Sequence, residues 1–138
     1  MSLMTWTKEQ FATNVTQHDQ EHQTIFDMVN KLHESAGGAD RSTIGKQLDA
    51  LIAYVAEHFG AEERNMIKCS YADYPQHKLE HEKLVQTCVD LQKQFHAGKA
   101  EITRDTTAFL ADWLVNHILN TDKRLGEYLK QHMPAQDG

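Results

Sequence analysis

Apolar residues recur along most of the chain at alternating intervals of three and four positions, which is the spacing of one face of an α-helix. One stretch shows this rhythm clearly, from Ile44 through Leu48, Leu51 and Val55 to His58. No stretch alternates at every second position, as a half-buried strand does. The pattern therefore predicts an all-α protein, with helices over about residues 17–36, 41–67, 75–97 and 104–124 and a short turn or helix to about residue 132.

The expected helix ends coincide with residues that start or stop helices. Asp40 or Ser42 can cap the N-terminus of the second helix. Pro75 suits the first turn of the third helix, where its missing N–H costs nothing, and Gly98 suits the end of that helix. Four helices of about 20 residues, each roughly 30 Å long, predict an antiparallel up-down-up-down four-helix bundle with an extended N-terminal arm over about residues 1–16.

Composition narrows the class of protein. The 138 residues, of which 40% are hydrophobic and 25% charged, fit a single domain over residues 1–138. We expect a cytoplasmic protein without membrane insertion, because no apolar run of 18 residues occurs and no basic segment precedes an apolar one at the start. A net charge of −6 argues against nucleic acid as a partner, and two cysteines are too few for a disulfide scaffold.

Nine histidines are unusual in a chain of this size, and five of them fall on the inward faces of the expected helices. A single histidine there is more often a hydrogen-bonded core residue than a ligand. Seven buried polar groups without partners would each cost several kcal/mol, however, against a net stability of about 5–15 kcal/mol for a small domain. We therefore expect a metal core built from seven side chains: His22, His58, Glu62, His77, His81, His117 and Asp122.

The spacing of these residues supports chelation. Two pairs are separated by four positions, which places each pair on one helix face: His58 with Glu62, and His77 with His81. Asp122 instead follows His117 by five positions, about 140° around a regular helix. We predict a π-type widening or an early helix end between His117 and Asp122, because a regular helix could not direct both at one centre.

The number and type of ligands indicate iron. Five imidazoles and two carboxylates exceed the four ligands of a structural zinc site, and no thiolate joins them. Mixed nitrogen and oxygen ligation suits iron. Two octahedral irons would offer roughly twelve positions, of which the histidines, two bridging carboxylates and one bridging oxide or hydroxide fill about eleven. This count leaves about one position open for a small ligand.

These residues carry a resemblance to a known family. His22, the HxxxE motif at 58–62, the HxxxH motif at 77–81 and the HxxxxD motif at 117–122 resemble the seven-ligand pattern of the hemerythrins. The flanking residues are similar to the single-domain bacterial members, and the similarity extends over about residues 6–128. The resemblance implies two iron ions in a non-haem, oxo- or hydroxo-bridged diiron centre, with dioxygen as the ligand.

The resemblance also implies a role for each ligand. Glu62 and Asp122 would bridge the two irons. The histidines would divide unequally, with three on one iron and two on the other: His77, His81 and His117, then His22 and His58. Apolar residues beside the open position would form the wall of the oxygen pocket: Ile25, Phe59, Trp113 and Leu114. Leu125 departs from the family pattern, because many relatives have tyrosine there.

The expected function is reversible dioxygen binding at this diiron centre, for oxygen storage, transport or delivery to an oxygen-consuming enzyme. We expect a monomer that is not itself an enzyme. The alternative is a diiron oxidase or peroxidase, or a protein that detoxifies or senses nitric oxide or oxygen. Binding is favoured because the sequence contains none of the Glu-x-x-His motifs of ferritin-like diiron oxidases, and because no output domain of a sensor is apparent.

The remaining histidines match no motif. We expect four of them at the surface or at helix ends: His18, His33, His96 and His132. Glu63 follows a ligand directly and is expected either in the second coordination sphere or at the surface. Cys88 lies on the inward face of the third helix, where a thiol behaves as a small buried apolar group.

Overall fold

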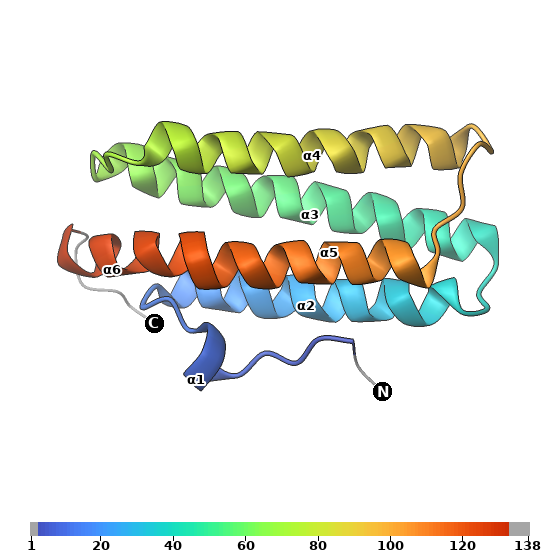
Figure 1. Cartoon of the computed structure of the whole chain (residues 1–138), viewed down its shortest axis with the longest axis horizontal. Coiled ribbons are helices and arrows are strands. Elements are labelled where there is room, and N and C mark those ends of the chain that lie inside the picture. Colours follow the sequence, from blue (N-terminus) through green and yellow to red (C-terminus); the bar gives the residue numbers. More distant parts are fainter. Residues whose placement is uncertain (1–2, 133–138) are drawn as a thin grey trace.

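A computed structural model describes residues 3–132, which fold into a bundle of four long helices that run alternately up and down (Figure 1). Within these residues no segment forms a strand. The predicted all-α, antiparallel four-helix bundle is confirmed. The elements in chain order are α1 (Lys8–Phe11), α2 (Thr16–Ala36), α3 (Arg41–Lys68), α4 (Tyr74–His96), α5 (Arg104–His117), η1 (Ile118–Asp122) and α6 (Lys123–His132).

Local residues determine where the long helices begin and end. The side chain of Asp40 accepts a hydrogen bond at 2.8 Å from an amide one turn later, so Asp40 caps α3 and Ser42 lies inside the helix. Thr103 caps α5 in the same way. Pro75 lies in the first turn of α4, and Gly98, whose φ is +78°, follows the last turn. The bounds of α3 and α4 therefore differ from the expected ranges by at most one residue at each end.

The N-terminal arm crosses the outside of the bundle and contains one helical turn, α1, that the sequence did not predict (Figure 1). Phe11, the last residue of this turn, packs edge-on against Phe26 of α2, with ring centroids 5.1 Å apart. Thr13 ties the arm to α2 by donating to Asp19 from its amide at 2.9 Å and from its hydroxyl at 2.8 Å. A helix of four residues is too short to show a period in the sequence.

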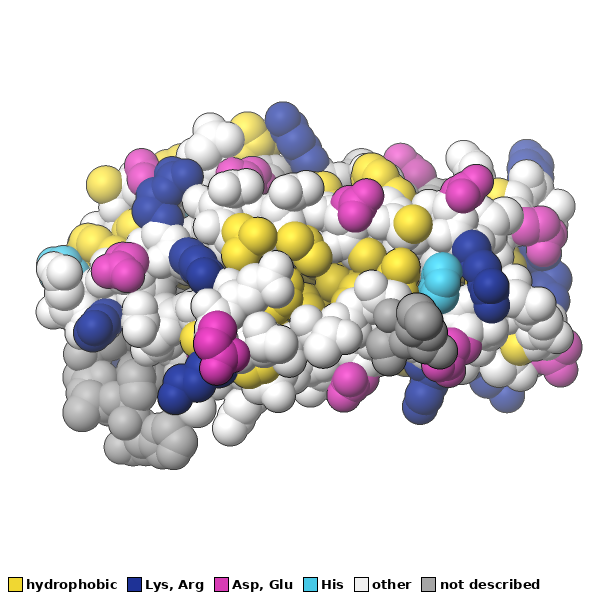
Figure 2. All heavy atoms as spheres, turned by 60° about the horizontal axis from the view of Figure 1, so that its bottom comes forward, with side chains coloured by type: hydrophobic (Ala, Val, Ile, Leu, Met, Phe, Trp, Pro, Cys, Tyr) yellow, Lys and Arg dark blue, Asp and Glu magenta, His cyan; other side chains and the backbone are white. Residues whose placement is uncertain are grey.

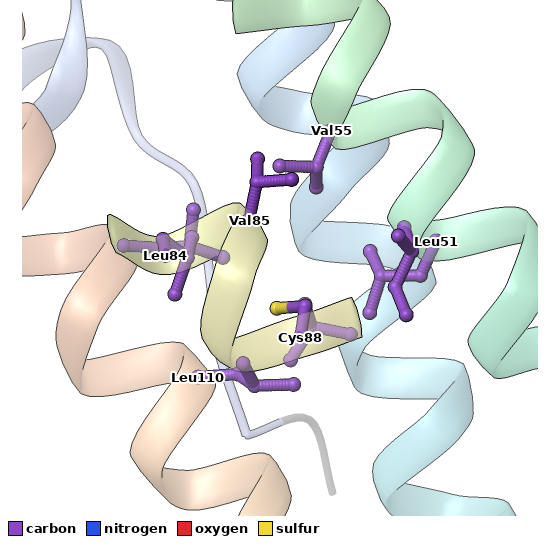
Figure 3. A pocket seen from close by; sticks show the side chains of 9 residues that line it. Leu51, Val55, Leu84, Val85, Cys88 and Leu110 are labelled. Carbon is purple, nitrogen blue, oxygen red and sulfur yellow. The ribbon is translucent and has the colours of Figure 1, made fainter. Parts of the chain in front are cut away.

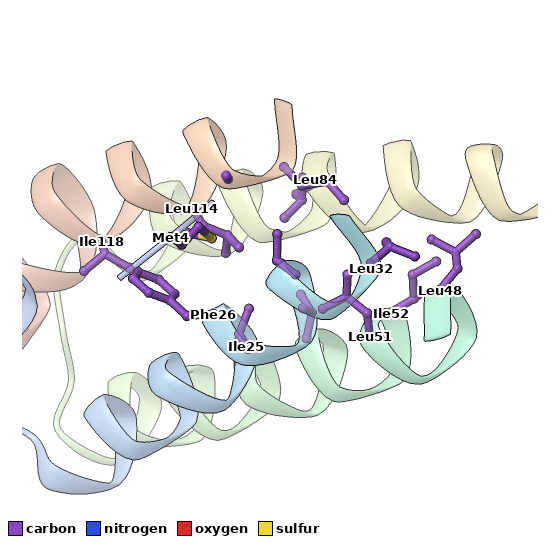
Figure 4. Packing of buried hydrophobic residues seen from close by; sticks show 14 of the residues in the cluster. Met4, Ile25, Phe26, Leu32, Leu48, Leu51, Ile52, Leu84, Leu114 and Ile118 are labelled. Atoms are coloured by element: carbon purple, nitrogen blue, oxygen red, sulfur yellow. The ribbon is translucent and has the colours of Figure 1, made fainter. Parts of the chain in front are cut away.

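Two apolar clusters fill the bundle on either side of a polar layer. The larger cluster draws buried side chains from α2, α3, α4 and α5, among them Ile25, Leu48, Leu84 and Leu114 (Figure 4). The smaller cluster lies where α3 turns into α4 and where α6 packs: Val15, Met66, Tyr71, Leu125 and Leu129. The histidines and carboxylates singled out in the sequence lie between the two clusters along every long helix.

The outer faces of the helices are mostly polar and charged. On the face that carries the N-terminal arm, charged side chains of both signs surround a central group of apolar ones (Figure 2). Three large apolar side chains of the described residues are exposed: Ile67, Leu79 and Phe109. No helix within residues 3–132 is long and apolar enough to cross a lipid bilayer.

Gly126 allows α6 to approach the arm closely. A Cβ atom at this position would lie 1.7 Å from the carbonyl oxygen of Thr13. A glycine-to-alanine change inside a helix ordinarily stabilises the helix by about 0.5–1 kcal/mol. We expect Gly126→Ala to lower the free energy of unfolding by about 1–3 kcal/mol instead, because the backbone of the arm must move away. Urea denaturation measures the difference.

Gly38 provides the matched control for this experiment. A Cβ atom at Gly38 would meet no atom within 4 Å, so Gly38→Ala should be as stable as the unaltered chain or slightly more so. If Gly126→Ala proved at least as stable as the unaltered chain, the close packing of α6 on the arm would contribute nothing to stability.

Candidate metal centre

All seven side chains expected as ligands meet in one buried layer of the bundle. Their ligand atoms form two overlapping groups, within each of which the atoms lie within 4.8 Å of one another. The larger group is Glu62, His77, His81, His117 and Asp122, and the smaller is His22, His58, Glu62 and Asp122. Both carboxylates belong to both groups, and each of the seven residues is at most 5% exposed.

Regular helix geometry directs five of these side chains into the layer. α3 presents His58 and Glu62 from successive turns, and α4 presents His77 and His81 in the same way. His22 comes from the inward face of α2. Because α2, α3 and α4 pack side by side, their inward faces meet at one level of the bundle.

The π-helical turn η1 directs the other two. α5 ends at His117, and Ile118–Asp122 form the π-helix before α6 continues as an α-helix. The wider turn brings residues five positions apart onto one face, so Asp122 Oδ1 lies 3.1 Å from His117 Nε2. The widening predicted between His117 and Asp122 is confirmed.

Glu62 lies between the two groups of histidines. Its Oε1 lies 3.1 Å from His81 Nε2 and 3.6 Å from His77 Nε2. Its Oε2 lies 3.3 Å from His58 Nε2 and 3.5 Å from His22 Nε2. One carboxylate oxygen of Glu62 therefore faces each group.

Asp122 also lies between the two groups of histidines. Its Oδ1 lies 3.1 Å from Nε2 of both His77 and His117, and its Oδ2 lies 3.1 Å from His22 Nε2. Each carboxylate therefore turns one oxygen to each histidine group, and the two groups share both carboxylates.

Many polar atoms in this layer are buried without a hydrogen-bond partner among the described residues. They include both oxygens of each carboxylate and the Nε2 atoms of four histidines: Glu62, Asp122, His22, His77, His81 and His117. Buried polar groups are nearly always paired, because an unpaired one costs several kcal/mol. Metal ions between these atoms would satisfy all of them together, so the donor set fits bound cations.

Three further carboxylates hold the outer nitrogens of the histidines. In each case an imidazole Nδ1–H donates to a glutamate on a neighbouring helix, which leaves the Nε2 lone pair directed at the centre of the layer. The pairs are His58 with Glu21 at 2.7 Å, His81 with Glu63 at 2.9 Å, and His117 with Glu80 at 2.9 Å. Such partners orient metal-binding histidines and raise their basicity.

No motif in the sequence marks Glu21 or Glu80, and Glu63 was expected either in the second coordination sphere or at the surface. All three glutamates stand directly beside an expected ligand in the chain, at positions 21, 63 and 80. A step of one residue turns a helical side chain by about 100°, from the centre of the bundle toward the next helix. An acidic residue adjacent to a ligand is therefore a sequence signal for such a partner.

His18 lies in the first turn of α2, at a helix end as expected, but it is buried and not at the surface. It is 2% exposed, its Nε2 lies 3.0 Å from the side-chain nitrogen of Asn65, and its Nδ1 lies 3.9 Å from Glu62 Oε2. The reason is its position four residues before His22, on the same inward face of α2. Of the other histidines without a motif, two are exposed and one is half-buried: His96 and His132, then His33.

Without a metal ion, protonated imidazoles balance the two buried carboxylates. Burial opposes the protonation of His58, but the nearby charge of Glu62 and the hydrogen bond to Glu21 outweigh it and raise the pKa to about 10. Burial is likewise outweighed at His77, where Asp122 and Glu62 raise the pKa to about 9. Burial also opposes the ionisation of the two central carboxyls, yet the surrounding histidines hold their pKa values well below the usual range. The layer therefore favours positive charge at its centre.

Apolar side chains pack against the layer. The four expected pocket-wall residues are buried or half-buried: Ile25, Phe59, Trp113 and Leu114. Phe59 stacks on His81, with ring centroids 3.8 Å apart, and Trp113 stacks on His117 at 4.5 Å. Two of the wall residues therefore contact histidines of the larger ligand group.

Leu114 also lines an apolar cavity within the bundle. The cavity has a volume of about 20 Å³, which is enough for one molecule the size of water. Its lining comes from four helices: Val29, Leu51, Ile52, Val55, Leu84, Val85, Cys88, Leu110 and Leu114 (Figure 3). Burial raises the pKa of the Cys88 thiol to about 11, so this side chain stays uncharged and the lining stays apolar.

Comparison with known sequences identifies close relatives of this chain. A family model described as the hemerythrin HHE cation binding domain matches residues 13–129. The bacteriohemerythrin of Methylococcus capsulatus is 60% identical over 129 residues, which cover 94% of this chain and 98% of that protein. The bacteriohemerythrin of Stenotrophomonas maltophilia is 29% identical over 133 residues, which cover 96% of this chain and 86% of that protein.

Solved structures agree with the sequence comparisons. The crystal structure of a wild-type hemerythrin superposes with a TM-score of 0.92 at 60% identity, and the match covers 94% of this chain and 99% of that one. The resemblance inferred from the seven expected ligands is confirmed, since both comparisons extend over nearly the whole chain. The chain therefore belongs to the hemerythrin family.

Proposed function

We propose that this chain holds two iron ions in its buried layer and binds dioxygen reversibly there, for oxygen storage, transport or delivery. The observation that carries this proposal is the division of five histidines into groups of three and two around two shared carboxylates. Membership of the hemerythrin family supports iron as the metal and dioxygen as the ligand.

The unequal histidine groups would leave one cation with an open position. The proposed ligands are His77, His81 and His117 for one ion, His22 and His58 for the other, and Glu62 and Asp122 as bridges between them. If both ions take the same number of ligands, the ion with two histidines keeps room for an external ligand. When bound, the iron pair supplies this position and the electrons for reversible oxygen binding.

Carboxylates outside the ligand set would keep this geometry fixed. Glu21, Glu63 and Glu80 each accept a hydrogen bond from a histidine Nδ1. A ring held in this way cannot turn away from the centre without breaking a charged hydrogen bond. Both histidine groups contain at least one such ring, which supports repeated binding and release of a ligand without loss of metal.

The apolar wall would exclude charged species from the open position. Ile25, Phe59, Trp113 and Leu114 are the proposed wall residues, and their burial supports this role. Moving an anion or a proton through such a wall costs desolvation energy, whereas uncharged dioxygen meets no such cost. The cavity that Leu114 lines extends the apolar environment further into the bundle and would suit a small uncharged molecule.

A binding role is favoured over catalysis in this proposal. Both buried carboxylates are used as bridges, so neither is free to act as a general base, and the histidine-rich ligand set offers few anionic donors to stabilise high-valent iron. The chain would therefore bind oxygen and deliver it to separate, oxygen-consuming enzymes. Free Cys69 and Cys88 agree with the reducing cytoplasm, and a ligand set drawn from one chain agrees with a monomer.

The proposed function predicts a reversible change in the visible spectrum. Reduced, iron-loaded protein should contain two irons per chain, gain an absorption band in air and lose it when oxygen is removed, over repeated cycles. Anaerobic spectroscopy combined with iron analysis of the same samples measures both. A single irreversible change with release of hydrogen peroxide would identify a diiron oxidase instead of an oxygen carrier.

Two substitutions make this experiment specific to the buried layer. His22→Gln removes a histidine from the smaller group and should abolish the band. His96→Gln alters an exposed histidine and should leave the cycling unchanged. Reversible cycling that persisted in His22→Gln would place oxygen binding away from the smaller group.

Iron uptake should release protons and should depend on pH. In the metal-free chain the pKa of His58 is raised to about 10 and that of His77 to about 9, whereas a ligand must be deprotonated to bind metal. Protonated His58 and His77 stabilise the folded, metal-free chain because their pKa values are raised above the ordinary histidine value of 6.5. This stabilisation is fully present below pH 6.5 and is lost as the pH rises through 9 to 10. Iron affinity should rise over the same range.

The difference in melting temperature between the iron-loaded and metal-free chains should therefore widen from about pH 6.5 to about pH 9. Anaerobic thermal unfolding at several pH values measures this difference, and a pH indicator counts the protons released on iron addition. A constant difference together with no proton release would show that these two histidines are already neutral in the metal-free chain.

A further inference from the structure

Glu80 of α4 contacts the residue that precedes the π-helical turn and a residue near the end of that turn. His117 Nδ1 donates to Glu80 Oε1 at 2.9 Å, and the hydroxyl of Thr121 donates to the same oxygen at 3.0 Å. His117 is the last residue of α5, and Thr121 directly precedes Asp122 within η1. One carboxylate oxygen on a separate helix thus contacts both ends of the turn.

The π-helical turn requires support from outside its own helix. Its hydrogen bonds span five positions, as between the Lys123 amide and the Ile118 carbonyl, and not the usual four. Such turns are rare in isolated helices, because the α-helical turn is the more favourable one. Closing η1 to an α-helical turn would rotate Asp122 by about 100° relative to His117 and would move its carboxylate out of the buried layer.

The other two glutamates that accept from a histidine Nδ1, Glu21 and Glu63, do not make a comparable connection. Glu63 accepts from His81, and Glu21 accepts from His58 and from Gln17, which belongs to its own helix. Neither bond involves a residue of η1. Through its contact with Thr121, Glu80 therefore holds a residue of η1 in addition to orienting a histidine.

We propose that Glu80 is a positioning residue that fastens His117 and Thr121 together and thereby keeps the π-helical turn open, with Asp122 in register for the centre. This inference rests on the proposed function in one respect only, namely that Asp122 binds the iron ions. The claim that Glu80 and Thr121 hold η1 open concerns the metal-free chain as well.

Solvent reaches this contact, which makes a clean test possible. Glu80 and Thr121 line a surface pocket of about 300 Å³ beside His117 and Trp113, and the Glu80 side chain is 34% exposed. If the Thr121 hydroxyl is removed, water can take its place on Glu80 Oε1. The effect of removing the hydroxyl then reflects the broken connection between Glu80 and η1, because no buried polar atom is left without a partner.

The first measurement is amide hydrogen exchange at residues 118–123 in the metal-free chain. Thr121→Val removes the hydroxyl and keeps the branched shape, and it should speed exchange there about tenfold, as expected when a hydrogen bond to a charged group is lost. Thr121→Ser restores the hydroxyl and should exchange like the unaltered chain. Thr87→Val is the matched control, because the hydroxyl of Thr87 bonds only within α4, to the Lys83 carbonyl, and it should change nothing at residues 118–123.

The second measurement is the rate at which iron(II)-loaded protein loses metal to a strong chelator under anaerobic conditions. Thr121→Val should lose iron roughly tenfold faster, the scale found when an outer partner of a metal ligand is removed. Glu63→Gln should also speed iron loss, since it releases His81, but it should leave exchange at residues 118–123 unchanged. This contrast separates general loss of ligand support from loss of the turn.

The two proposals can fail separately. A chain that takes up no iron pair would defeat the proposed function, while hydrogen exchange in the metal-free chain would still decide the role of Glu80. Exchange at residues 118–123 that stayed at the unaltered rate in Thr121→Val would overturn that role. Equal acceleration in Thr121→Val and Thr121→Ser would overturn it too, since the hydroxyl would then not matter.

Discussion

Two carboxylates buried with all four oxygens free of hydrogen bonds are the constraint on which the rest of this bundle depends. Glu62 is 0% and Asp122 2% exposed, and their oxygens find no hydrogen-bond partner among the described residues. Several kcal/mol for each unpaired group is a large part of the roughly 5–15 kcal/mol that keeps a small domain folded. Positive charge has to compensate, and five histidines surround the pair. A pair of bound cations meets the same requirement more completely.

The three glutamates that accept hydrogen bonds from histidine Nδ1 atoms, Glu21, Glu63 and Glu80, connect this requirement to the order of the helices. Each helix supplies the carboxylate that holds a histidine of the next helix in the chain: α2 to α3, α3 to α4, and α4 to α5. These bonds fix how far each helix is rotated about its axis, and the apolar clusters above and below keep the layer in a medium of low polarity, where such bonds are strong. The polar layer thus specifies the arrangement of the bundle as well as the ligand geometry.

Helical periodicity explains why so much of the fold and the site could be predicted from the sequence. Spacings of four positions place two ligand pairs on inward faces, and the single spacing of five, between His117 and Asp122, predicts the π-helical turn. Periodicity gives the face on which a side chain lies but not what the opposite helix offers. Glu21 and His58 are 37 positions apart and meet only through packing. The burial of His18 was not predicted because no motif marks this residue, although its spacing of four positions from His22 equals the spacing within each expected ligand pair.

Diffraction from iron-loaded crystals at the iron absorption edge is the most direct test of a dinuclear centre in this layer. We expect two anomalous peaks per chain, one among the group of three histidines and one among the group of two, with Glu62 and Asp122 in contact with both. Iron loading can be checked in the same crystals by fluorescence. A single peak, or a second peak outside the buried layer, would contradict the dinuclear centre and the bridging role of both carboxylates.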